Sequence, residues 1–577
     1  MISNADIAKI LREISEYLGM ESEPFKPRAY EKAAEAIESL SDSAEAAYSS
    51  GGIDALKKIP GVGESIAEKI EEFIETGKIK YYAELKAKTP VELSELRRIE
   101  GLGPRKIKAL YDKLGIKNLK DLDKAIAAGK IRDLEGFGEK SEIKFKKGLE
   151  FVSSAGNRMP VAYAVPLVEE IRARLLKVKG VKTVVAAGSY RRRRETIGDI
   201  DLLVISNESK RVTDCFTSMP EVAQILASGE TKSSVKLKTG MDVDLRVVPD
   251  ESYGAALNYF TGSKDHNVAL REIAIGFGLK LNEYGLYKGS KLVAGKTEED
   301  IYNTLKLSYI PPELRENTGE IELARKGKLP EILQYGDVLG DLQVQTNWTD
   351  GAHSILQMAE AAMKLGRKYI AITDHTKSLG VANGLDEKRL REQMREIDAM
   401  NVHLSQAGHD FRVLKGTECD ILKDGRLDLP DSLLAELDVV GVSVHSNFNL
   451  SREEQTKRVK RAMANPHADI FFHPTGRLIG KREGYQVDID EIIRHAKATA
   501  TVLEINAFPE RSDLSDQNIR KCVDLGVKMS IDSDAHHMDH LSFIEYGISQ
   551  ARRGWATKRD IINAWPFEKM FRFLKKS

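Results

Sequence analysis

Three aspartates are spaced so that they could act together on a phosphate ester: Asp199, Asp201 and Asp244. Asp199 and Asp201 stand one residue apart where an apolar run begins, and alternate residues of a strand share a face. Asp244 belongs to a second apolar run, which predicts a neighbouring strand. Clustered carboxylates stay ionised together only beside cations, and two Mg²⁺ ions about 3.5–4 Å apart meet that need. The pattern predicts phosphoryl transfer with two Mg²⁺ ions, and Mn²⁺ is an alternative.

A glycine–serine pair precedes the aspartates. Gly188 and Ser189 follow the apolar run 181–187, and residues 191–194 are all arginine. We expect the glycine and the hydroxyl to lie against a triphosphate and Arg192 to neutralise its charge. A bare Asp-x-Asp pair is typical of ordinary strand ends. The added Gly-Ser pair and the later strand aspartate favour a catalytic site.

A five-residue glycine turn occurs three times, at 59–63, 99–103 and 134–138, each time before a basic helical stretch. Such turns expose backbone N–H groups at a helix N-terminus, where phosphate oxygens bind. One copy is typical of an ordinary helix end, but three copies favour sequence-independent binding of a DNA backbone. Na⁺ or K⁺ at these turns is a further expectation. The residues expected to contact DNA here are Gly61, Gly63, Gly101, Gly103, Arg105 and Lys106.

Histidine is concentrated near the C-terminus: His266 is the only one before residue 350, and eleven follow. Several of these, with carboxylates, come just after short apolar runs. Those positions predict the C-terminal ends of strands, where the sites of α/β barrels gather. This ligand density suits two or three Zn²⁺ or Mn²⁺ ions in a phosphoesterase. The candidate ligands are Asp350, His375, Glu418, His445, His473, Asp534 and His536.

The elements that must position these residues change along the chain. Residues 5–75 have the pattern of short amphipathic helices, and residues 160–255 alternate between helix and strand. After Pro311-Pro312, short apolar runs alternate with helical stretches, which favours a largely parallel sheet or barrel. We therefore expect a multidomain protein of α+β and α/β class.

Length and composition agree with such a protein. The 577 residues predict three to five domains. The 88 Lys and Arg balance 88 Asp and Glu, but residues 81–150 carry 17 against 12, which suits a phosphate backbone. Three scattered cysteines fit no disulfide framework. No apolar run reaches the ~18–20 residues of a membrane span, and no export signal is visible. We expect a cytoplasmic protein that does not enter a membrane.

The segment from Gly188 to Ile205 resembles the nucleotidyltransferase signature of family X DNA polymerases, the group that includes DNA polymerase beta. Residues 259–271 resemble that family's nucleotide-pocket motif. The resemblance implies template-directed gap filling, in which dNTPs are added to a primer 3′-OH on gapped or primer-template DNA by a monomer. It also implies that the nucleotide is contacted by Tyr259, Phe260, Gly262 and Asn267. DNA contacts are implied for Arg246 and Arg271.

The resemblance covers the whole chain, including a C-terminal PHP (polymerase and histidinol phosphatase) domain. It implies a palm with a mixed sheet, a helical and β thumb, and a distorted (β/α) PHP barrel with 3′–5′ exonuclease activity. The implied domains are an N-terminal helix–hairpin–helix, lyase-like domain at 1–85, a fingers-type helix–hairpin–helix domain at 86–155, the palm at 156–255, the thumb at 256–318, a linker at 319–337 and the PHP domain at 338–577.

Lys69 aligns with the lysine that attacks an abasic sugar as a Schiff-base nucleophile in lyase-competent members of the family. Lys26 and Tyr30 also match family positions in that pocket. The chemistry needs a neutral amine. Ser65 and Tyr81 stand where lysines would support it, so two alternatives stay open: lyase chemistry and simple phosphate binding.

The chain departs from the PHP pattern at its first motif. The usual His-x-His reads Gln343-Val-Gln345 here. A glutamine carbonyl is a weaker ligand for Zn²⁺ or Mn²⁺ than imidazole, so the ion shared with Glu418 and Asp534 should bind poorly. The other two ligand groups are complete: Glu418, His445 and His473, and Asp350, His375 and His536. We expect a weakened or absent exonuclease with residual metal binding.

Two other functions are compatible with parts of the sequence. In one, the PHP domain is the main activity, as a metal-dependent nuclease or AP endonuclease, and the rest is a DNA clamp. Gln343 and Gln345 argue against it. In the other, the chain is a non-catalytic DNA-binding scaffold, which the complete set of palm aspartates disfavours.

Overall fold

The structure is a computed structural model that describes residues 4–21, 26–38, 43–99, 101–155 and 158–574. The chain divides into two compact units: residues 1–156 with 480–482, and residues 157–479 with 483–577. The predicted boundary between the fingers-type domain and the palm falls at residues 155 and 156. Residues 156–157 lie outside the described part of the chain. None of the helices in the described ranges has the length and apolarity that crossing a membrane requires.

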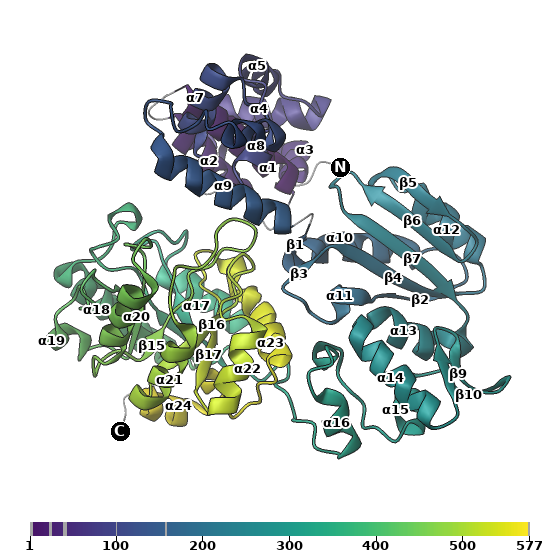
Figure 1. Ribbon diagram of the computed structural model, residues 1–577. Helices are drawn as coiled ribbons and strands as arrows, with labels where there is room; N and C mark the ends of the chain where they lie inside the picture. The colour runs from purple at the N-terminus through teal and green to yellow at the C-terminus, as the bar shows by residue number, and fades with distance from the viewer. Residues whose placement is uncertain (1–3, 22–25, 39–42, 100, 156–157, 575–577) are drawn as a thin grey trace. The chain divides into compact units, whose positions relative to one another are not determined.

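The first unit is helical (Figure 1). In its first helix, Ile7, Leu11, Ile14 and Leu18 recur every three or four residues and are almost fully buried, which is the pattern of a helix with one apolar face. The short helices of this unit pack their apolar faces into one core. The helices are α1 (Asn4–Met20), α2 (Lys26–Glu38), α3 (Ala44–Lys57), α4 (Glu64–Thr76), α5 (Lys80–Lys88), α6 (Leu93–Leu96), α7 (Pro104–Leu114), α8 (Leu119–Ala127) and α9 (Gly138–Ala155).

The second unit begins with a five-stranded mixed sheet in the order β2-β4-β7-β6-β5. Strands β4 and β7 are parallel, and the other neighbours are antiparallel. The edge strand β5 is largely exposed. The elements are β1 (Met159–Pro160), α10 (Val161–Leu175), β2 (Val181–Ala186), α11 (Gly188–Arg191), β3 (Thr196–Ile197), β4 (Asp199–Ser206), α12 (Ser209–Thr217), β5 (Val222–Ser228), β6 (Lys232–Leu237) and β7 (Asp242–Val248).

Both faces of β4 are covered. Leu202 and Val204 belong to one apolar core, whereas Leu203 packs with Ala256 and Leu257 of α13 on the other face. Because strand residues alternate between faces, residues 199 and 201 share the face of Leu203. The sheet therefore directs the two aspartates toward the side on which α13 lies.

A helical and β region follows the sheet. Its strands β8, β9 and β10 form a small antiparallel sheet. Within residues 319–337, which the sequence marks as a linker, α16 forms and buries Ile321 and Ala324 in this region's apolar core. The elements are α13 (Tyr253–Thr261), α14 (Lys264–Gly276), β8 (Lys280–Asn282), β9 (Gly285–Lys288), β10 (Lys291–Ala294), α15 (Glu298–Thr304) and α16 (Glu320–Arg325).

The remaining residues form seven parallel strands in chain order, from β11 to β17. A parallel bridge between Val344 and Ala535 connects the first strand to the segment after the last, so the barrel is nearly closed. The strands are β11 (Gly340–Val344), β12 (Tyr369–Ile372), β13 (Arg412–Asp420), β14 (Val439–Ser443), β15 (Ile470–Phe471), β16 (Val502–Asn506) and β17 (Met529–Asp532).

Helices surround these strands, as an α/β barrel requires (Figure 1). The expected parallel α/β barrel is confirmed. The helices are α17 (Ile355–Lys364), α18 (Glu387–Gln406), α19 (Asp431–Leu434), α20 (Arg452–Met463), α21 (Ile489–Thr499), α22 (Asp516–Leu525), α23 (Ile544–Arg553) and α24 (Phe567–Leu574).

Candidate functional site

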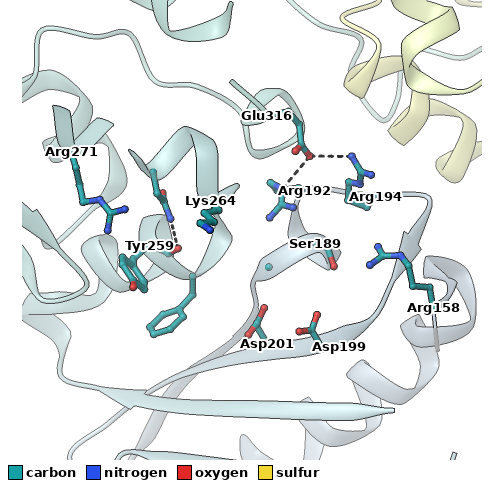
Figure 2. A pocket seen from close by; sticks show the side chains of 14 residues that line it. Arg158, Ser189, Arg192, Arg194, Asp199, Asp201, Tyr259, Lys264, Arg271 and Glu316 are labelled. Carbon is teal, nitrogen blue, oxygen red and sulfur yellow. Dashed lines mark hydrogen bonds and ion pairs between the residues drawn. The ribbon is translucent and has the colours of Figure 1, made fainter. Parts of the chain in front are cut away.

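The parallel register of β4 and β7 brings the three aspartates together. Asp201 pairs with Asp244, and Asp199 pairs with Asp242. Asp199 and Asp201 line a cavity of about 590 Å³, and Figure 2 shows both carboxylates directed from the strand into it. Two segments that are far apart in the chain thus contribute carboxylates to one place.

These carboxylates repel one another electrostatically. Burial raises the pKa of Asp201 to about 7, and the charges of Asp199 and Asp244 contribute to the shift. A group with this pKa is only partly ionised near neutral pH. Divalent cations would stabilise the ionised form of all three aspartates, so the residues fit a metal site.

The Gly-Ser turn lies above the aspartates. Gly188 begins the short helix α11 with a φ of +57°, a conformation that favours glycine. The Ser189 hydroxyl oxygen is buried and has no hydrogen-bond partner among the described residues. It lines the same cavity. A buried hydroxyl without a partner suits a ligand oxygen.

The arginine run has a different environment at each position. Arg191 makes two hydrogen bonds to the Glu298 carboxylate, at 2.9 and 2.7 Å, and is directed away from the cavity lining. Arg192 lines the cavity, where its Nη1 donates to the Thr261 carbonyl at 2.5 Å and its Nε donates to Glu316 at 3.1 Å. Burial lowers the pKa of Arg192, although Glu316 opposes that shift. Arg192 is therefore placed to meet an anionic ligand.

Helices α13 and α14 supply the opposite wall. Tyr259, Phe260, Gly262, Asn267 and Arg271, all from the predicted nucleotide-pocket motif, line the cavity. The Asn267 amide donates to the Tyr259 carbonyl at 2.7 Å, and its buried side-chain oxygen lacks a partner in the described part of the chain. The Arg246 guanidinium lies 5.2 Å from the ring centre of Phe260. Arg194 of the arginine run lines the cavity too, and three further lining residues were not singled out from the sequence: Arg158, Lys264 and Glu316.

The first two glycine turns of the first unit have the geometry of phosphate-binding turns. Gly61 and Gly101 adopt left-handed φ values of +82° and +80°. Gly63 and Gly103 are the N-cap residues of α4 and α7, and neither helix start has a side-chain cap. Free N–H groups at such helix starts suit phosphate oxygens. Arg105 and Lys106 follow in the first turn of α7.

Lys69 lies on α4 and is half-buried. Its amine donates to the Ser65 carbonyl at 2.9 Å and to the Ser65 hydroxyl at 3.0 Å. It also lies 5.0 Å from the ring centre of Tyr81. Tyr30 is buried, and burial raises its pKa to about 12. The structure buries Lys69 only in part, whereas full burial would favour the neutral amine that a Schiff-base nucleophile needs.

The barrel gathers the second set of candidate ligands around Glu418, which is buried. The nearest nitrogen atoms of His375, His445 and His473 lie 3.4, 3.1 and 2.8 Å from its carboxylate. Burial alone would raise the pKa of Glu418, but His375 and His445 hold it well below its ordinary value. Oδ1 of Asp420 lies 3.1 Å from Nδ1 of His445. Metal-binding histidines commonly have a carboxylate at the ring nitrogen that does not bind the metal.

Two groups of three ligands could each hold a metal ion within the described residues. One group is Asp350, His375 and His536, and the other is His375, Glu418 and His445. The sequence predicts His375 in the first group only, and it predicts His473, not His375, as the partner of Glu418 and His445 in the second. His473 nevertheless contacts Glu418, so all these predicted ligands lie at one end of the barrel.

Gln343 and Gln345 point amide groups at the same carboxylate. Their Nε2 atoms donate to Glu418 Oε2 at 3.2 and 3.0 Å. Nearby, the Arg511 guanidinium is 3.0 Å from Asp534, which the sequence assigns as a metal ligand. Amide donors to Glu418 and the guanidinium beside Asp534 thus occupy the two carboxylates that an ion would otherwise contact. The sequence reasoning missed Arg511, because no local pattern connects it with residue 534.

Further acidic groups lie behind these ligands and were not identified from the sequence. Burial raises the pKa of Asp532 to about 8 and that of Asp341 to about 6, and it raises the pKa of Glu504 well above its ordinary value. Glu504 and Asn506 stand at the end of β16 in an i, i+2 pattern. That pattern is the same signal that identified Asp199 and Asp201.

Models of known families match four segments of the chain. They are the DNA polymerase beta palm (158–242), the DNA polymerase beta thumb (256–316), a helix-hairpin-helix domain (2–79) and a SAM-like helix-hairpin-helix tandem (93–149).

Whole proteins also match. The DNA polymerase/3′-5′ exonuclease PolX of Bacillus subtilis (strain 168) is 38% identical over 581 residues, which cover 99% of each chain. DNA polymerase lambda of Rattus norvegicus is 25% identical over 343 residues, 54% of this chain and 56% of that protein. A probable phosphatase of Thermoanaerobacter sp. (strain X514) is 28% identical over 236 residues, 38% of this chain and 89% of that protein.

Proposed function

Because the chain belongs to the family X DNA polymerases, in the PolX branch with a C-terminal PHP domain, we propose that it is a template-directed DNA polymerase that fills gaps during DNA repair. One observation carries the proposal. Asp199, Asp201, Ser189 and Arg192 line a single cavity, and Asp201 pairs in register with Asp244 of β7. The Ser189 hydroxyl has no hydrogen-bond partner among the described residues. This arrangement offers carboxylates for metal ions beside donors for a triphosphate.

The residues of the site have distinct proposed roles. Asp199, Asp201 and Asp244 would hold two Mg²⁺ ions, or Mn²⁺, which when bound favour attack by the primer hydroxyl and stabilise the departing pyrophosphate. Gly188, Ser189 and Arg192 orient the triphosphate. Nucleotide contacts from the opposite wall are assigned to Tyr259, Phe260, Gly262 and Asn267.

DNA is held mainly through its phosphates. The first two glycine turns, with Arg105 and Lys106, contact the backbone and would bind Na⁺ or K⁺, and Arg246 and Arg271 contact the DNA near the cavity. We also propose that the chain acts as a monomer in the cytoplasm, where its three free cysteines remain reduced. The proposed domain limits are those given by the sequence.

A weak 3′–5′ exonuclease in the barrel is the second proposed activity. The groups Asp350–His375–His536 and His375–Glu418–His445 support residual binding of Zn²⁺ or Mn²⁺. The amide groups of Gln343 and Gln345 and the guanidinium of Arg511 occupy the carboxylates of the remaining position. The proposed weakness follows from losing one cation beside the scissile phosphate.

For Lys69, an amine that is only half-buried and that donates to Ser65 supports the phosphate-binding alternative. Treatment with borohydride on DNA that carries a 5′ abasic sugar should therefore trap little covalent complex. Efficient trapping by the wild-type chain that is lost in Lys69→Ala would establish lyase activity instead.

Primer extension across a one-nucleotide gap tests the main proposal. Asp201→Ala should lower the incorporation rate on the order of 10³-fold, because metal-ion catalysis supplies several kcal/mol and each ~1.4 kcal/mol is tenfold. Asp214→Ala, an exposed aspartate of α12, is the matched control. Unchanged incorporation by Asp201→Ala would contradict the assignment. End degradation that survives Asp201→Ala but fails in His445→Ala would make the barrel nuclease the main activity.

A further inference from the structure

Arg553, the last residue of helix α23 of the barrel, contacts the arginine run of the nucleotide cavity. Its Nη1 donates to the Arg192 backbone carbonyl at 2.9 Å and to Glu316 Oε1 at 3.0 Å. The side chain is 2% exposed. All these residues belong to the second compact unit. A buried barrel arginine is thus bonded directly to a residue of the cavity lining.

Glu316 links the two arginines. The oxygen that accepts from Arg553 also accepts from Arg192 Nε at 3.1 Å. Figure 2 shows the Glu316 carboxylate joined to Arg192 and to Arg194 above the cavity. Arg553 therefore holds Arg192 in two ways, at its backbone carbonyl and through the carboxylate bonded to its guanidinium.

Arg553 has a second carboxylate partner, since Glu316 is shared with Arg192 and Arg194. A buried arginine is costly to desolvate unless carboxylates and hydrogen bonds compensate. Asp516 of α22 accepts from Arg553 Nε at 3.0 Å and from Nη2 at 2.6 Å. Asp516 thus fixes the plane of the Arg553 guanidinium and leaves Nη1 directed at Arg192 and Glu316.

Barrel side chains also hold the C-terminal end of the arginine run, at Glu195. Glu195 accepts from Arg477 Nη2 at 2.6 Å and from Gln550 Nε2 at 3.1 Å. Between the two attachments, Arg193 adopts a left-handed φ of +54°, a conformation that non-glycine residues reach only at some cost. Barrel side chains bonded on both sides of residue 193 maintain this backbone.

We propose that Arg553 is a positioning residue for nucleotide binding: the barrel orients Arg192 toward the triphosphate, so the nucleotide affinity of the polymerase site depends on the barrel. This inference rests on the proposed polymerase function. It gives the barrel a role in polymerisation that is independent of its metal ligands. It also explains why Arg192 reaches the cavity whereas the adjacent Arg191 bonds to Glu298.

Steady-state gap filling by Arg553→Ala tests the proposal. We expect the KM for dNTP to rise roughly 10-fold, since small displacements of a positioning group cost one to two orders of magnitude, with a smaller change in kcat. The KM for pyrophosphate in the reverse reaction should rise by a similar factor, whereas the Kd for gapped DNA should not change. Arg553→Lys retains a charge and one donor, so it should recover part of the loss.

Arg391→Ala is the matched control, because this barrel arginine pairs with Glu436 on an exposed surface. In a double-mutant cycle, Arg553→Ala should add little to Arg192→Ala if it acts through Arg192. A folded Arg553→Ala protein with an unchanged KM for dNTP would overturn the proposal. If that variant does not fold, Glu316→Ala decides, because it removes the carboxylate that accepts from both Arg192 and Arg553 and leaves Arg553 in place. An unchanged KM for dNTP would again refute the idea.

The outcome is separable from that of the main proposal. If the chain is no polymerase, the wild type and Arg391→Ala also fail to incorporate dNTPs. If only the positioning role is wrong, the wild type incorporates normally and Arg553→Ala matches it.

Discussion

A Cβ atom added to Gly188 would lie 2.1 Å from Oδ2 of Asp201. No real side chain tolerates this distance, and the φ of Gly188 is also left-handed. The turn that carries Ser189 therefore approaches the carboxylate as closely as a backbone can. The glycine sets the separation between the proposed donors for the triphosphate and the carboxylates proposed to bind metal ions.

Gly188→Ala should strongly impair nucleotide incorporation. The added methyl group must displace either α11 or Asp201, and a misplacement of about 1 Å can cost on the order of 10²-fold in rate. Gap-filling kinetics measure the effect. Gly336→Ala is the control, since a Cβ there meets nothing within 4 Å. An incorporation rate within twofold of the wild type would show that the close approach has no catalytic consequence.

The raised pKa of Asp201 predicts how metal-free stability depends on pH. Burial and the neighbouring aspartates raise this pKa from 3.8 to about 7. The folded chain then holds a proton that the unfolded chain releases, so stability falls as pH rises from about 4 to 7. Asp201→Asn removes that penalty and should raise the unfolding temperature in EDTA at pH 8.

Thermal unfolding of both proteins in EDTA at pH 5 and pH 8 checks this prediction. The advantage of Asp201→Asn should shrink at pH 5, where the wild-type carboxyl is mostly protonated. Added Mg²⁺ should raise the unfolding temperature of the wild type more than that of the variant, because bound cations offset the repulsion. An equal difference at both pH values would contradict the role assigned to this carboxyl.

Restoring imidazole at the first PHP motif should strengthen the exonuclease. Gln343→His/Gln345→His replaces two amide donors to Glu418 with metal ligands. We expect Mn²⁺-dependent release of 3′ nucleotides from labelled DNA to rise at least about 10-fold, given what a metal ion contributes. An Asp201→Ala background removes the polymerase and its reverse reaction from the measurement.

Gln517→His adds a histidine at an exposed position of α22 and serves as the control. The ion pair between Arg511 and Asp534 competes with the restored metal position. Adding Arg511→Ala to the double variant should therefore increase Mn²⁺ affinity further. Release of nucleotides that is equally slow in all these variants would show that the two glutamines are not what limits the barrel.

The candidate polymerase site was largely predictable because its signals are local. Asp199 and Asp201 share a face by strand periodicity, and Gly188 and Ser189 precede them in the same stretch. The strand ends of the barrel were predictable for the same reason, since each ligand follows a short apolar run. The family resemblance supplied the lining residues of α13 and α14, which have no pattern of their own.

The remaining contacts depend on long-range packing. Glu316 reaches Arg192 across 124 residues, and Arg553 does so across 361. No spacing rule connects such pairs. Likewise, the sequence shows that Gln343 and Gln345 replace histidines, but only the folded chain shows their amides bonded to Glu418 and a guanidinium beside Asp534.

The parallel pairing of β4 with β7 makes the positions of the aspartates independent of the length of the segment that connects the two strands. The aspartates are fixed by register at the strand starts, whereas the intervening crossover, α12 with β5 and β6, leads to an exposed edge of the sheet. Insertions or deletions in the turn between β5 and β6 leave that register intact. Among relatives, this segment is therefore free to diverge in length, and it offers a place to attach a probe without disturbing the chemistry.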